Sequence, residues 1–344
     1  MASASSPSTF TDLHPLIIQT HILPRLDGQS LSSAATASSY IRALCADDIL
    51  WSNICKSTWP SITHPRIHHL ISTFPAGHRS FFQDSFQPPI TVVKHPNHHR
   101  SYSISHPDCS LTHQPFPSEL ISVVDIRYHD DIIYSKAEFT DATTEFLSSA
   151  FKIELKDDPE VTGMPRSIDF NVEDVEDSDD ATISHLQESI TLNWILIDPT
   201  LKHALNLSSI KPVLAWITDS IYLRYVVVLP GCDANETVEC RIEVKLGAGK
   251  GGVALYVREV IVNVQNVACN HLSGKDFLVI TRKVVLERYN IRRDVVECEA
   301  GRNQTKCVKG DETIRRYVGH DHYWAFDYKR VGIVWFLMVF GGLQ

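Results

Sequence analysis

Apolar residues recur at every third or fourth position near the start of the chain, which is the spacing of one face of an α-helix. Ile18, Ile22 and Leu26 stand four residues apart in this stretch. Pro24 has no N–H to donate to the carbonyl four residues earlier, so we expect the helix to end or kink there. A helix this short and this apolar needs a large part of its surface covered by other elements or by a partner.

The helical pattern continues as far as Phe86. Asp27 and Gly28 together are a turn signal that separates the first helix from the next. The apolar spacing predicts further short helices within residues 29–45, 46–59, 64–74 and 77–86. The first of these segments is rich in small residues and is expected to form a pair of helices.

After two consecutive prolines at 88 and 89, the pattern changes to short runs rich in β-branched residues, and several of these runs alternate apolar with polar positions. The runs cover residues 90–93, 119–128, 131–139, 150–155, 189–197, 213–217, 221–229, 237–246, 253–264 and 276–289. Polar or glycine-rich turns join them, which is typical of antiparallel sheets in a sandwich or a strongly bent sheet. The regular strand–helix alternation of a doubly wound α/β fold does not occur. We therefore predict an α+β fold, with short helices followed by a mainly antiparallel β-rich domain.

Two long polar segments interrupt the predicted strands. Residues 95–117 are rich in histidine and proline, and residues 156–180 are strongly acidic. We expect both to be exposed loops.

Charge and cysteine content narrow the class of protein. The 344 residues carry a formal net charge of -9, which argues against a general nucleic-acid binder, because such proteins need a basic surface. Eight cysteines are scattered without a CxxC pair, and the start of the chain has no signal-peptide pattern. We expect reduced thiols and a location in the cytoplasm or the nucleus.

The histidines raise the question of a metal site. Those of the first third of the chain, apart from His14 and His21, are His64, His68, His69, His78, His95, His98, His99, His106 and His113. His64 and His68 share the i, i+4 spacing of two ligands on one helix face, but Cys109 is the single cysteine near the cluster. Zinc sites usually have cysteines at defined spacings, so a polar helix face and a histidine-rich loop are the stronger interpretation.

Motifs for catalysis are equally weak. The glycine-rich stretch around Lys250 fails as a phosphate-binding loop, because Val244 and Gly251 occupy positions that require glycine and serine or threonine. A nucleophile elbow is missing, and the carboxylates show no spacing that marks an acid–base pair. The sequence therefore predicts no catalytic residue, no cofactor and no metal.

The last residues, 331–344, are apolar over about twelve positions, fewer than the ~20 that a helix needs to cross a bilayer. They can form a final strand or helix that closes the core, or a tail that associates with a membrane. Both interpretations stay open.

Residues 12–56 carry the spacing of a known motif. Its positions are Pro15, Ile18, Ile22, Leu23, Leu26, Leu31, Leu50 and Trp51. This pattern resembles the F-box, and the whole chain resembles a plant F-box family that also has the GHRSFFQDSF segment and a β-rich second half. The resemblance implies a small trihelical unit that docks a Skp-type adaptor, and through it a cullin, as the substrate receptor of a ubiquitin ligase.

On this resemblance we expect one set of residues to contact the adaptor or to support the contact from the core. The set is Pro15, Ile18, Ile22, Leu23, Leu26, Leu31 and Trp51. The expected organisation is a flexible tail at 1–11, the F-box at 12–56, a helical linker region at 57–87, a β-rich substrate-recognition domain at 88–330 and the apolar tail at 331–344.

Other functions are compatible with the same sequence. The β-rich half could bind a small molecule, a glycan or a modified peptide, with Trp194, Trp216 and Tyr225 as candidate contacts. The chain could also be a membrane-tethered adaptor, or a hydrolase or transferase built on the sheet. The identity of the substrate protein does not follow from the sequence.

Overall fold

The computed structural model describes residues 14–86, 115–156, 168–169, 179–218, 220–231, 236–248 and 254–286. The predicted strand at 90–93, nearly all of the histidine-rich loop, most of the acidic loop and the apolar tail lie outside these residues. The chain divides after Thr281 into two units, and every contact discussed below lies within the first.

The first helical stretch consists of three short pieces, α1 (Pro15–Ile17), the π-helical turn η2 (Ile18–Ile22) and the 3₁₀ turn η3 (Leu23–Arg25). The Leu23 N–H donates to the carbonyl of Ile18, five residues back. Pro24 lies in the last turn, and the chain becomes extended at Leu26. The predicted break at this proline is confirmed, because an α-helical bond from position 24 cannot form.

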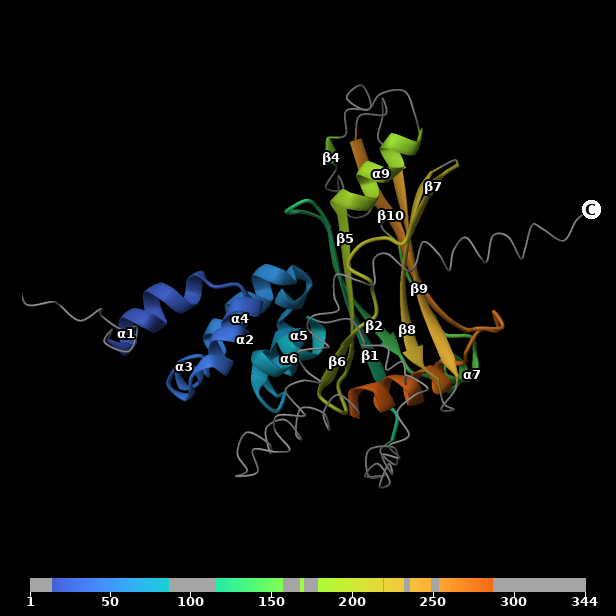
Figure 1. The fold of residues 1–344 in the computed structure, drawn as a ribbon. Helices are drawn as coiled ribbons and strands as arrows, with labels where there is room; N and C mark the ends of the chain where they lie inside the picture. Colours follow the sequence, from blue (N-terminus) through green and yellow to red (C-terminus); the bar gives the residue numbers. More distant parts are fainter. Residues whose placement is uncertain are drawn as a thin grey trace, which may run out of the picture. The chain divides into compact units, whose positions relative to one another are not determined.

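The remaining helices of this region follow in close succession (Figure 1). They are α2 (Gly28–Ala37), α3 (Ser39–Leu44), α4 (Asp48–Thr58), the 3₁₀ turn η4 (Pro60–Thr63), α5 (Pro65–Ser72) and α6 (Gly77–Ser85). Side chains cap three of them: Asp27 accepts from the Ser30 N–H, Ser38 from that of Tyr40, and Asp47 from that of Ile49. These caps satisfy N–H groups that have no partner within the helix. All four predicted helical segments are confirmed.

Two antiparallel sheets form the second part of the fold (Figure 1). The four-stranded sheet has the order β2 (Asp131–Asp141), β1 (Glu119–Tyr128), β5 (Ile190–Asp198) and β6 (His203–Asn206). The larger sheet has the order β3 (Lys152–Lys156), β10 (Ala254–Asn266), β9 (Thr237–Ala248), β8 (Ile221–Pro230) and β7 (Leu214–Ile217), and β4 (Ile168–Asp169) pairs with β10. Every strand pairing that the structure describes is antiparallel, as predicted.

The predicted strand at 276–289 is wrong, because a helix occupies residues 274–286. Ser273 caps this helix by accepting from the Asp276 N–H (3.1 Å), while its hydroxyl donates to the Asp276 carboxylate (2.7 Å). Phe277, Ile280 and Thr281 are buried at the i, i+3, i+4 spacing of a helix face. The β-branched composition of this segment favours a strand. The Ser273 cap and the helical spacing of the buried residues favour a helix, and the segment is helical. Two short helices, α7 (Thr144–Ser148) and α9 (Asp179–Ser189), were not predicted either.

Strand β1 of the four-stranded sheet is buried on both faces. On one face, Ile121 and Val123 of β1 and Ile195 of β5 join the core of the helices. Residues of β1 that point the other way, such as Val124 and Ile126, are buried as well. This double burial explains why β1 reads as an almost continuous apolar run.

Strand β8 of the larger sheet shows the contrasting pattern. Leu223 and Tyr225 are buried, whereas Tyr222 and Arg224 between them are partly exposed. The larger sheet therefore has one buried face and one face open to solvent, which is the usual basis of alternation along an antiparallel strand.

Polar contacts join the helices to the four-stranded sheet. The buried carboxylate of Asp125 on β1 accepts from the Ser61 N–H (3.1 Å), the Ser61 hydroxyl (2.5 Å) and the Ser135 hydroxyl (2.7 Å). Asp84 of α6 lies 2.9 Å from the His203 ring nitrogen Nδ1 on β6. Directional bonds of this kind fix the orientation of two packed layers, which apolar contacts alone fix less strictly.

Candidate adaptor-binding surface

Three large apolar side chains of the first helices are exposed. Leu16 and Ile17 of α1 are 60% and 45% exposed, and Ile49 near the start of α4 is 70% exposed. The other large apolar side chains of these helices are buried or pack against one core, so poor packing does not explain the exposure of these three. Leu16 and Ile17 are neighbours on α1, and Ile49 lies on another helix. Adjacent exposed apolar side chains of this kind are a candidate contact for a protein partner.

The residues predicted from the sequence are divided between core and surface. Ile18, Leu23, Leu31 and Trp51 are fully buried. Ile22 and Leu26 are partly buried and pack against the same core, and Pro15 is exposed. The structure thus brings the four buried members of the set together in the core of the helices. The role of the whole set in binding an adaptor stays a prediction.

Ile49 is outside the predicted set, although its position on the helix is a signal of exposure. Trp51, Ile54 and Cys55 share one face of α4, and Ile49 is about 200° from Trp51 around the helix axis at 100° per residue. An apolar residue on the face opposite the core must be exposed unless another element covers it.

Trp51 is a fully buried member of the core of the helices. Its indole N–H donates to the carbonyl of Cys45 at 2.7 Å, and its ring lies 5.4 Å from that of Phe82 on α6. Gly28 at the start of α2 also packs against Phe82, so closely that a Cβ there would come within 2.8 Å of three ring atoms. Glycine is therefore required for this approach of helix to ring.

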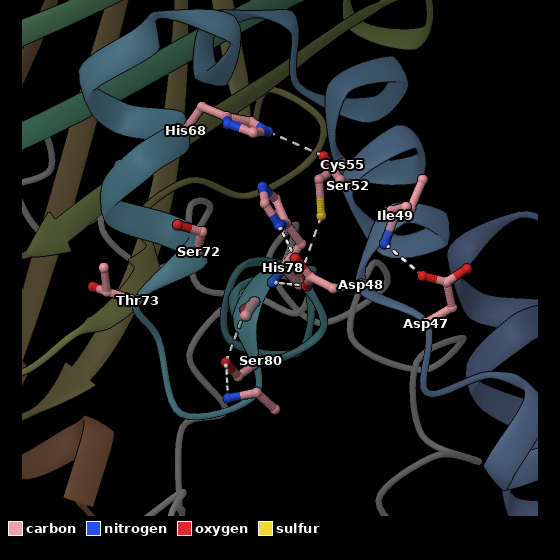
Figure 2. Close-up of polar contacts among 12 residues, drawn as sticks. Asp47, Asp48, Ile49, Ser52, Cys55, His68, Ser72, Thr73, His78 and Ser80 are labelled. Carbon is pink, nitrogen blue, oxygen red and sulfur yellow. Dashed lines mark hydrogen bonds and ion pairs between the residues drawn. The ribbon is translucent and has the colours of Figure 1, made fainter.

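The start of α4 is fixed by its own cap and by a contact with α6 (Figure 2). The Asp48 carboxylate accepts from the backbone N–H of His78 at 2.7 Å, and its second oxygen lies 2.9 Å from His78 Nδ1. Asp47 accepts from the Ile49 N–H at 3.0 Å. Ile49 is thus presented from a helix end that is held on two sides.

The neighbouring histidine and cysteine are not poised for chemistry. His68 Nε2 lies 3.2 Å from the Ser52 hydroxyl (Figure 2), and burial, together with the charge of Lys56, lowers the pKa of His68. Cys55 donates to the His78 carbonyl, and burial strongly raises the pKa of its thiol. His68 is therefore neutral at pH 7 and the Cys55 thiol is protonated, so this cluster has a structural role.

Comparison with known proteins decides the family. The F-box-like family model matches residues 15–57. Three proteins of Arabidopsis thaliana are similar over most of their length: F-box protein At2g27310 (37% identical, over 79% of this chain and 77% of the relative), probable F-box protein At2g36090 (37%, 86% and 83%) and F-box protein At3g44326 (34%, 77% and 70%). The chain belongs to the F-box proteins. No solved structure matches it.

The contact between Asp48 and α6 in the F-box region gives a testable prediction about Gly77. This glycine has a φ of +56°, and a Cβ built on it would lie 2.3 Å from an Asp48 carboxylate oxygen. Gly77→Ala should lower the free energy of unfolding by about 1–3 kcal/mol, because both the backbone conformation and the close contact oppose a side chain. Urea denaturation followed by circular dichroism measures this difference.

A second variant separates the two causes of the Gly77 effect. In an Asp48→Ala background the close contact is absent, so Gly77→Ala should cost only the backbone part, about 1 kcal/mol. Equal costs in both backgrounds would show that Asp48 does not restrict this position.

The histidine cluster forms no metal site in the part of the chain that the structure describes. There, no three side chains of histidine, cysteine, aspartate or glutamate are arranged to hold a metal ion. His64, His68, His69 and His78 lie within this part. The other histidines of the cluster, from His95 to His113, lie outside it.

The three aromatic residues considered for ligand binding are not equivalent. Trp194 and Tyr225 are fully buried, and the Trp194 indole N–H donates to the Ser122 hydroxyl. Trp216 is partly exposed, but its ring stacks on Tyr222 at 5.2 Å, with the Arg224 guanidinium 4.9 Å from the ring centre. These contacts assign Trp194 and Tyr225 to the core and Trp216 to a stack within the sheet.

Among the described residues of this F-box protein, every helix is too short or too polar to cross a bilayer. The apolar tail at 331–344 lies outside this range.

Proposed function

We propose that the chain is the substrate-recruiting subunit of a Skp–cullin–F-box ubiquitin ligase. Its F-box would dock a Skp-type adaptor, and through it a cullin, while the β-rich half holds the target protein. The observation that carries this proposal is the exposure of Leu16, Ile17 and Ile49 on a domain of the F-box family. In this proposal Ile18, Leu23, Leu31 and Trp51 support the docking surface from the core.

The exposed side chains can supply a large part of the binding energy. Burying one large aliphatic side chain stabilises a complex by about 1.5–3 kcal/mol before the costs of association. Three such anchors are comparable to the small number of residues that dominate the affinity of many interfaces. The rigid presentation of Ile49 by the Asp48–His78 contact reduces the ordering cost on binding.

The chain itself contributes no catalytic residue in this proposal. The reactive thiol belongs to the ubiquitin-conjugating enzyme, and the receptor raises the effective concentration of the target's lysines near it. The contacts of Asp125 with Ser61 and of Asp84 with His203 support this role, because they hold the helices in a fixed orientation on the sheet.

The proposed domain limits remain those of the sequence, with the F-box at 12–56 and the substrate-recognition domain at 88–330. The linker region at 57–87 contributes Phe81 and Phe82 to the core around Trp51, so it would act as an extension of the F-box. Buried free cysteines such as Cys55 are typical of the cytoplasm and the nucleus, where such a ligase would act.

Co-expression with a plant Skp-type adaptor tests the proposal. We expect the full chain and the adaptor to elute together from a size-exclusion column in equimolar amounts. Separate elution of a folded chain and a folded adaptor would contradict the proposed function.

A further inference from the structure

One end of the open face of the larger sheet carries basic and aromatic side chains. The register places Tyr222 of β8 opposite Lys245 of β9, and the Lys245 ammonium nitrogen lies 5.3 Å from the centre of the Tyr222 ring. The Arg258 guanidinium carbon lies 5.7 Å from the centre of the Tyr256 ring, and Arg258 Nε donates to the Tyr256 hydroxyl at 3.1 Å. We call these four side chains, Tyr222, Lys245, Tyr256 and Arg258, the basic end of the sheet.

Arg258 reaches this position because of a bulge and a glycine. The pairing of β10 with β9 shifts its register between Val257 and Glu259, so Arg258 is the extra residue of the bulge. Its side chain lies across Gly247, since a Cβ built on that glycine would come within 2.5 Å of Arg258 Nε. Arg258 is exposed, and among the described residues its hydrogen bond goes to a neutral hydroxyl. Its charge is therefore accessible to an acidic group.

Two other cations of the same face are already paired within the sheet. Arg224 Nη2 lies 2.7 Å from the Glu243 carboxylate. Arg241 Nη2 lies 2.9 Å from the Glu239 carboxylate. An ion pair has no net charge, so it attracts a third, acidic group much less than a single cation does. Arg241 is thus a natural control for the basic end.

Two described elements bring another part of the chain to this end of the sheet (Figure 1). Strand β4 pairs with residues 254 and 255 of β10, directly before Tyr256, on the edge where β3 also pairs. Helix α9 lies against β7 at the opposite edge. Four strand spacings separate β4 from β7, about 19 Å at ~4.8 Å each. Residues 170–178 connect β4 to α9, and they reach about 30 Å when extended, enough to cross the sheet on the way.

The connecting segment is strongly acidic. Its sequence, FNVEDVEDS, contains Glu173, Asp174, Glu176 and Asp177 and no basic residue. These residues lie outside the described ranges. A short tether of this kind gives a segment an effective concentration on the order of millimolar at a neighbouring surface. An acidic segment of a partner, or of a second copy of the chain, would have to compete with that concentration.

We propose that residues 173–177 bind the basic end of the larger sheet, with their carboxylates against Lys245 and Arg258. The rings of Tyr222 and Tyr256 hold the two cations on the open face, so little side-chain entropy is lost when the carboxylates bind. An acidic segment of another protein then reaches this surface only by displacing residues 173–177. The inference goes beyond the proposed function and does not depend on it.

Cleavage of the full chain by a glutamate-specific protease tests the contact in its natural setting. At low ionic strength, the double variant Lys245→Ala, Arg258→Ala should be cut after Glu173 and Glu176 at least about fivefold faster than wild type, because the segment loses both cations. The control Arg241→Ala removes a paired cation of the same face and should be cut at the wild-type rate. Mass spectrometry of the first fragments identifies the cleaved bonds.

A fluorescent peptide with the sequence of residues 170–178 tests whether the chain's own segment is the occupant. By anisotropy, the peptide should bind at least about tenfold more tightly to a chain with Glu173→Gln, Asp174→Asn, Glu176→Gln and Asp177→Asn than to wild type, since the neutral segment no longer competes. Adding Lys245→Ala and Arg258→Ala to that chain should abolish the gain. Circular dichroism should show the same fold for every variant.

Three outcomes would overturn the inference. One is equal cleavage of wild type and the double variant at low ionic strength. Another is equal peptide affinity for wild type and the neutralised chain, because the basic end would then be open to acidic partners. The third is a wild-type dimer that the neutralised chain does not form, because the acidic residues would then bind a second copy.

Discussion

Trp51→Ala should lower the free energy of unfolding by about 3–5 kcal/mol, the range measured when large aromatic residues are removed from a core. Trp51 is fully buried, its ring contacts Phe82, and its N–H bonds to the Cys45 carbonyl. The variant loses the apolar burial and leaves that carbonyl without its bond. Urea denaturation monitored by circular dichroism, at a fixed protein concentration, measures the loss.

Ile49→Ala is the matched control, two residues away on the same helix. Its side chain is largely exposed in the free protein, so the substitution should change the free energy of unfolding by less than about 0.5 kcal/mol. Trp51→Phe should lie between the two variants, since it keeps an aromatic ring and loses the N–H. A Trp51→Ala variant as stable as Ile49→Ala would contradict the assignment of Trp51 to the core.

The second large effect is expected at Asp125, which joins η4 to strands β1 and β2. Asp125→Ala should lower the free energy of unfolding by about 2–3 kcal/mol at pH 7, because the Ser61 N–H and two serine hydroxyls lose their acceptor. Asp125→Asn should cost less than about 1 kcal/mol, since its amide keeps an acceptor for the N–H and offers a donor to the hydroxyls. Asp130→Ala, at an exposed aspartate of the β1–β2 turn, is the control.

The pH dependence tests the charge state of Asp125. Burial raises the pKa of this carboxyl above its usual range, and the hydrogen bonds from Ser61 and Ser135 oppose that shift only in part. A raised pKa in the folded state means that Asp125 favours folding below about pH 4, and that this contribution is lost as the pH rises through the folded-state pKa. Wild type should therefore gain stability relative to Asp125→Asn when the pH falls from 7 toward 4. A constant difference between the two proteins over this range would show that the pKa is not raised.

Most strands could be predicted because burial leaves a simple pattern in the sequence. Strand β1 occupies 119–128, the predicted residues, since both of its faces are buried and its ends are polar. Strand β8 was predicted from its alternation, which reflects one buried and one open face. The sequence prediction missed the helix at 274–286. Its signals are the cap at Ser273 and a helical spacing of buried residues, and the four consecutive apolar residues 277–280 obscure that spacing. The β-branched composition of the segment is a stronger signal, and it favours a strand.

The identity of the F-box residues could be read from their spacing, but their exposure could not. The same apolar spacing describes Ile18, which is buried, and Ile22, which is partly exposed. Exposure depends on which helices pack against each face, and the contribution of Phe82 from α6 was not evident from the F-box segment alone. Distant pairs such as Asp125 with Ser61 are 64 residues apart and leave no local signal.

The affinity of the purified chain for a Skp-type adaptor, measured by titration calorimetry, tests the central claim most directly. Ile49→Asp should weaken binding at least tenfold, because it places a charge in an apolar contact, while the protein stays as stable as wild type. The control Val267→Asp changes another exposed aliphatic residue and should bind like wild type. Equal adaptor affinity for wild type and Ile49→Asp would contradict the assignment of this surface.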